Sequence, residues 1–126
     1  MNWKLIVVHG VAVSVVQLTT GVAEGYFNSQ PGSLFSAFSV LSFMACVGIF
    51  GHLGVRQTDR PFVHAYAALA LYAIVSLVVG AALSRMTGAE HWIFIAIEWL
   101  SLVVAATFGV TVGSISLRHL GTQDEA

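Results

Sequence analysis

The chain has 126 residues, of which 57% are hydrophobic and only 9% are charged, and its mean hydropathy is +0.85. This composition excludes an ordinary soluble domain. A formal net charge of −1 without a basic run gives no case for nucleic-acid binding. We therefore expect one integral membrane domain over residues 1–126, surrounded by the lipid bilayer.

Four apolar segments follow one another along the chain, each near the roughly 20 residues that a helix needs to cross a bilayer. They predict transmembrane helices at about residues 5–25, 34–55, 62–84 and 92–117. The composition of Asn28 to Gly32 is typical of a turn, and Asp59-Arg60-Pro61 ends one helix and starts the next. Because short loops make consecutive helices antiparallel neighbours, we expect an all-α, up-down, antiparallel four-helix bundle.

Positive residues predict the orientation of the bundle. Lys4, the loop that carries Arg56 and Arg60, and Arg118 all belong on one side, which the positive-inside rule makes the cytoplasm. We therefore expect both termini to be cytoplasmic, in a bacterial inner membrane. The first apolar segment also resembles a signal peptide, but we expect it to be a retained helix.

Four polar side chains interrupt the first apolar segment on one side of the predicted helix. His9, Gln17, Thr20 and Glu24 fall at about 0°, 80°, 20° and 60° when successive residues turn by about 100°. Such a stripe is costly against hydrocarbon, so it should face other helices, a cavity or a bound group. Its two ends are about 22 Å apart at roughly 1.5 Å per residue, so one compact site cannot use both.

In the predicted topology, four histidines lie toward the cytoplasmic ends of four different helices: His9, His52, His64 and His119. Facing helices build haem and metal sites in this way, and imidazole is a good ligand for haem iron and transition metals. His9 and His52 lie deepest and are the best pair. The alternative is that these side chains are ordinary interfacial residues, which water and headgroups satisfy.

Two acidic residues, Glu24 and Glu98, lie on the outer half of the predicted bundle. A membrane carboxyl that takes up and loses a proton suits a proton relay or an ion-coupled transporter, with Gln17 on the path toward His9. A protonated Glu98 that is hydrogen-bonded to Gln17 or Thr20 across the bundle is the structural alternative. A contact with a partner protein is a third interpretation.

The last apolar segment has a small residue at every fourth position: Ser101, Ala105, Gly109 and Gly113. This stripe predicts a helix interface, because small side chains let a neighbouring backbone approach. The neighbour could be another helix of the same chain, a second copy or a larger subunit. Cys46 is expected to be a small buried hydrophobic residue.

The sequence thus supports three hypotheses about function. The first is a small membrane subunit that packs through small-residue helix faces with itself or with a larger membrane complex. The second is a redox subunit that binds b-type haem, a transition metal or a quinone through His9, His52 and His64. The third is a small proton- or ion-coupled transporter or channel that uses Glu98. No catalytic motif is present, so any enzymatic role would be a redox or electron-transfer one.

Overall fold

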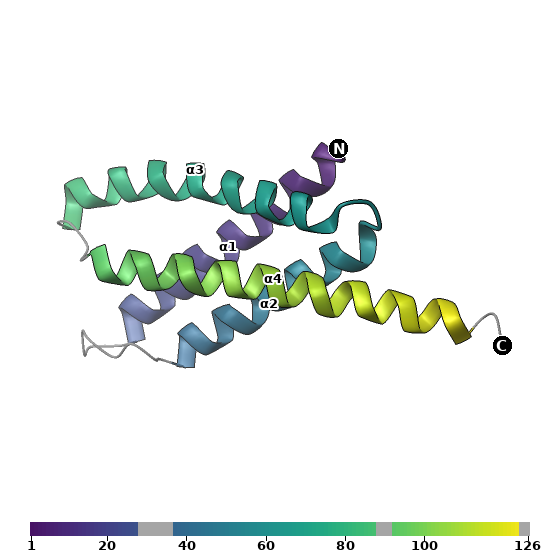
Figure 1. Cartoon of the computed structure of the whole chain (residues 1–126). Helices are drawn as coiled ribbons and strands as arrows, with labels where there is room; N and C mark the ends of the chain where they lie inside the picture. Colours follow the sequence, from purple (N-terminus) through teal and green to yellow (C-terminus); the bar gives the residue numbers. More distant parts are fainter. Residues whose placement is uncertain (28–36, 88–91, 124–126) are drawn as a thin grey trace.

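The computed structural model describes residues 1–27, 37–87 and 92–123, and these residues form four helices (Figure 1). The helices are α1 (Trp3–Phe27), α2 (Ala37–Arg56), α3 (Pro61–Thr87) and α4 (Trp92–Gln123). Each is long and apolar enough to cross a membrane. The expectation of an all-α chain with four helices that are long and apolar enough to span a membrane is confirmed.

The helix ends differ from the predicted ones mainly at the C-terminus. The fourth helix was expected to end near residue 117, but α4 continues through Arg118 to Gln123. The predicted end lies where the apolar residues stop. Helical backbone geometry does not require apolar residues, so α4 continues through the polar residues that follow. The predicted turn from Asn28 to Gly32 and the predicted start of the second helix at residue 34 lie outside the described residues.

Helix packing does not follow chain order. The most extensive contact joins α2 and α4, and α1 contacts both α2 and α3, whereas α3 has smaller contacts with α2 and α4. Within the described helices, α1 and α4 do not contact each other. In Figure 1 the start of α1, the end of α4 and the turn between α2 and α3 lie on the right, and the long α4 extends beyond the other helices.

Glycines explain why α2 and α4 pack so closely. A Cβ atom added at Gly113 would lie 2.2 Å from the carbonyl oxygen of Gly51, and one at Gly109 would lie 2.6 Å from the carbonyl oxygen of Val47. Neither site has room for a side chain, so the two backbones touch. The small-residue stripe of α4 is therefore an interface within this chain, and α2 covers its Gly109–Gly113 part.

The buried core is centred on this seam and extends to the other two helices. Phe50 and Leu53 of α2 pack with Leu102 and Val110 of α4, and all four side chains are almost fully buried. The remaining core residues come from all four helices, and the largest of those on α1 and α3 are Ile6, Val13, Leu69 and Tyr72. Most other large apolar side chains point outward, as expected for helices in lipid.

Candidate functional site

The structure brings together His9 of α1 and His52 of α2. His9 Nε2 lies 3.2 Å from His52 Nδ1, and the two rings are stacked with centroids 5.4 Å apart and planes inclined by 21°. His9 is buried, with 4% of its surface exposed, whereas His52 lies on the exposed surface of α2. The two rings form a hydrogen-bonded imidazole pair, which we call the His9–His52 pair.

The backbone of α1 fixes which ring nitrogen carries hydrogen. His9 Nδ1 lies 2.8 Å from the carbonyl oxygen of Leu5, one helical turn earlier. A carbonyl only accepts, so His9 donates from Nδ1 and, as a neutral ring, accepts at Nε2. His52 then donates from Nδ1, and its Nε2 carries a lone pair. No described residue contributes a hydrogen bond to that nitrogen.

The His9–His52 pair lies in a groove of about 410 Å³ between α1 and α2. This volume is within the range of roughly 300–1,000 Å³ that is common for small-molecule sites. The other lining residues are apolar and mostly small: Val8, Ala12, Ala45, Gly48 and Ile49. Because Val8, Gly48 and His52 are exposed, the groove opens on the outer surface of two membrane-spanning helices.

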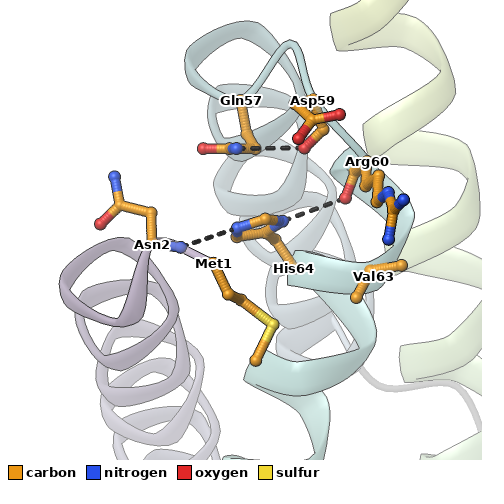
Figure 2. A pocket seen from close by; sticks show the side chains of 7 residues that line it. All are labelled: Met1, Asn2, Gln57, Asp59, Arg60, Val63 and His64. Carbon is orange, nitrogen blue, oxygen red and sulfur yellow. Dashed lines mark hydrogen bonds between the residues drawn. The ribbon is translucent and has the colours of Figure 1, made fainter.

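His64 has a different role, at the start of α3 (Figure 2). Its Nε2 accepts a hydrogen bond of 3.1 Å from the backbone N–H of Asn2, and its Nδ1 donates to the carbonyl oxygen of Arg60 at 3.0 Å. Arg60 has a left-handed backbone, with φ of 50°. His64 therefore links the first turn of α1 to the turn between α2 and α3, and both of its ring nitrogens are occupied.

A second cavity, of about 440 Å³, surrounds this link. It is lined mainly by polar residues, and Gln57 donates from Nε2 to the carbonyl oxygen of Asp59 at 3.0 Å on one side of it (Figure 2). These contacts hold the turn in place. The cavity is thus part of the structure that joins α2, α3 and the first residues of the chain.

The four predicted histidines do not form one cluster. His64 is engaged with Asn2 and Arg60, and His119 lies in the part of α4 beyond its predicted end. Among the described residues, no group of three His, Cys, Asp or Glu side chains is arranged to hold a metal ion. Bis-histidine haem ligation needs two free imidazole nitrogens, whereas the His9–His52 pair offers only His52 Nε2.

Glu98 accepts a hydrogen bond from a tyrosine on the neighbouring helix α3. The hydroxyl of Tyr72 on α3 donates to Glu98 Oε1 on α4 at 2.5 Å, and the Tyr72 ring lies 5.7 Å from that of Trp99. Tyr72 is buried, with 4% of its surface exposed. Tyr72 is thus a core residue whose hydroxyl also ties α3 to α4.

The two partners that were expected for Glu98 are engaged elsewhere. Gln17 donates from Nε2 to Cys46 Sγ at 3.6 Å, and Thr20 donates to the carbonyl oxygen of Val16 on its own helix at 2.7 Å. Because α1 and α4 do not contact each other within the described residues, Glu24 is not paired with Glu98. Gln17 and Thr20 thus make other contacts in the described residues, and Tyr72 is the residue that binds Glu98.

No protein-family model, curated protein or solved structure matches this chain. The chemistry that the site can support therefore follows from the geometry of the described residues. Two features stand out in that geometry, namely the His9–His52 pair in its groove and the Tyr72–Glu98 hydrogen bond between α3 and α4.

Proposed function

We propose that this chain is a small subunit of the bacterial cytoplasmic membrane that binds a lipid-soluble ligand of the quinone class in the groove between α1 and α2. In this proposal the helices cross the membrane alternately up and down, with both termini in the cytoplasm. One observation carries the proposal, namely a hydrogen-bonded imidazole pair in an otherwise apolar groove within two membrane-spanning helices.

The composition of the groove favours a flat, neutral head group with an apolar tail. Ala12, Ala45 and Gly48 leave space for a ring, and the open side of the groove allows the tail to extend among the lipid acyl chains. His52 Nε2 adds one directional hydrogen bond, which can hold the polar edge of the ring. A phosphate head group fits less well, because a charge within the spans is costly.

The same geometry favours a quinone-class ligand over haem and over proton transport. Only one imidazole nitrogen of the pair is open to a ligand, and a single hydrogen bond to a ring substituent needs no more than that. Glu98 in this proposal is a structural residue, because its carboxyl group accepts the hydroxyl of buried Tyr72. That bond supports a tie between α3 and α4 rather than a transport path.

We further propose that the chain works as part of a larger membrane complex or with a second copy of itself. The Gly109–Gly113 part of the α4 stripe is covered by α2, so a partner would contact a different face. The groove between α1 and α2 must remain accessible to lipid-soluble ligands. Such a partner therefore fits best against α3 or the outer side of α4.

Filling the groove tests the proposed function. A Cβ atom at Gly48 meets nothing within 4 Å, and the same holds at Gly80 on α3. Leucine at position 48 should therefore occupy the groove without a clash, and leucine at position 80 is a matched control outside it. The purified protein is placed in phospholipid nanodiscs, and the binding of a short-chain quinone is titrated in its oxidised and reduced forms.

We expect saturable binding of at least one form. Gly48→Leu should weaken this binding by about tenfold or more, which corresponds to a loss of roughly 1.4 kcal/mol, and Gly80→Leu should leave it unchanged. The proposal fails if neither form binds above the level of empty nanodiscs. It also fails if Gly48→Leu binds as tightly as the unchanged protein.

A further inference from the structure

We infer that the groove selects the reduced, hydroxyl-bearing form of its ligand, a hydroquinone, over the oxidised quinone. This inference rests on the proposed function, because it names the form that the same site prefers. It depends on which group donates and which accepts in a chain of two hydrogen bonds. The chain runs from the Leu5 carbonyl to the His9 ring and from there to the His52 ring.

The Leu5 carbonyl determines which ring nitrogen of His9 carries the hydrogen. At 2.8 Å, the Leu5 carbonyl oxygen and His9 Nδ1 need a hydrogen atom between them, and a carbonyl has none to give. In a neutral His9 ring that hydrogen is the only N–H, so Nε2 carries a lone pair. The opposite tautomer would place two acceptors 2.8 Å apart in a buried position, where an unmade hydrogen bond is unfavourable.

The tautomer of His9 in turn determines which ring nitrogen of His52 carries the hydrogen. His9 Nε2 lies 3.2 Å from His52 Nδ1, so this contact is a hydrogen bond only if His52 carries its hydrogen on Nδ1. His52 Nε2 then has a lone pair and no hydrogen. The ring nitrogen of exposed His52 that the pair leaves without a partner is therefore a hydrogen-bond acceptor.

The rest of the groove cannot change this polarity. The other lining side chains, those of Val8, Ala12, Ala45, Gly48 and Ile49, offer no donor, and the backbone N–H groups around them are used within α1 and α2. A quinone carbonyl would meet a lone pair at His52, whereas a hydroquinone hydroxyl can donate to it. The site therefore prefers the hydroquinone because its hydroxyl group is a hydrogen-bond donor that the quinone lacks.

Three ligands with the same short tail separate the possibilities: the hydroquinone, the quinone and the dimethyl ether of the hydroquinone. The ether keeps the shape of the reduced ring but has no hydroxyl hydrogen. Binding is measured without oxygen at about pH 8, which is above the ordinary imidazole pKa of about 6.5. His52→Leu serves as the variant that lacks the acceptor.

We expect the hydroquinone to bind about tenfold or more tightly than both the quinone and the ether, and His52→Leu to remove the difference. If the quinone or the ether binds as tightly as the hydroquinone, the inference is wrong and the proposed function stands. If none of the three binds saturably, the proposed function itself fails.

A spectroscopic readout does not depend on any variant folding. In protein labelled with ¹⁵N at histidine, the shifts should show protonated Nδ1 and unprotonated Nε2 in both His9 and His52 at the same pH. Finding the hydrogen of His52 on Nε2 would overturn the inference, whatever the affinities are.

Discussion

The histidine side chains of the bundle differ in how many ring nitrogens the protein itself uses. His64 uses both, one for Asn2 and one for Arg60, and His9 uses both, one for Leu5 and one for His52. His52 lines the groove, and its Nε2 makes no hydrogen bond with the described residues. His52 Nε2 therefore makes the site a hydrogen-bond acceptor, and the contacts of His9 with Leu5 and His52 hold the pair in place.

The hydrogen bond between Tyr72 and Glu98 allows a prediction about the stability of the protein. Tyr72→Phe removes the donor to Glu98 Oε1 and should lower the free energy of unfolding by about 1 kcal/mol, since hydrogen bonds between membrane helices are of this order. Tyr26→Phe is the control, because Tyr26 is 83% exposed. Unfolding by SDS titration in mixed micelles measures both changes.

A double-mutant cycle separates this bond from other losses at the same residues. In a Glu98→Leu background, Tyr72→Phe should cost clearly less than it does in the unchanged protein. Equal costs in the two backgrounds would mean that the Tyr72–Glu98 bond contributes nothing to stability.

Among the helices, α2 and α4 form the tightest unit. Sequence spacing predicts that the stripe from Ser101 to Gly113 is an interface, because four-residue periodicity places small residues on one face. It does not predict that α2 is the partner. A stripe describes one surface only, and the choice of partner depends on which other helix also has glycines at matching heights, here Gly51 and Gly54.

This seam predicts opposite responses to the same substitution at two glycines. Alanine stabilises a helix by about 1 kcal/mol relative to glycine. A Cβ atom at Gly80 meets nothing within 4 Å, so Gly80→Ala should be neutral or stabilising. Gly113→Ala places a Cβ against the Gly51 carbonyl oxygen and should destabilise by about 1–3 kcal/mol, as overpacking does. Thermal unfolding in detergent compares the two variants, and equal midpoints would contradict the close α2–α4 contact.

For the whole molecule, hydropathy and segment length are sufficient to predict four spanning helices, because both are local properties of the chain. The arrangement of those helices is not local. The sequence groups His9 with His52 by depth, and the structure brings them into contact. The sequence could not show that His64 binds the α2–α3 turn. It also could not show that α1 and α4 stay apart within the described residues. Both features depend on helix rotation and tilt.

The most direct test of the proposed function is to find where a quinone-class ligand binds. A photoreactive analogue with a diazirine next to the ring is irradiated in nanodiscs, and the labelled residues are identified by mass spectrometry. We predict labels on the groove-lining parts of α1 and α2, competed by unlabelled ligand, lost in Gly48→Leu and retained in Gly80→Leu. Labels spread over the lipid-facing surfaces of α3 and α4, without competition, would contradict the account.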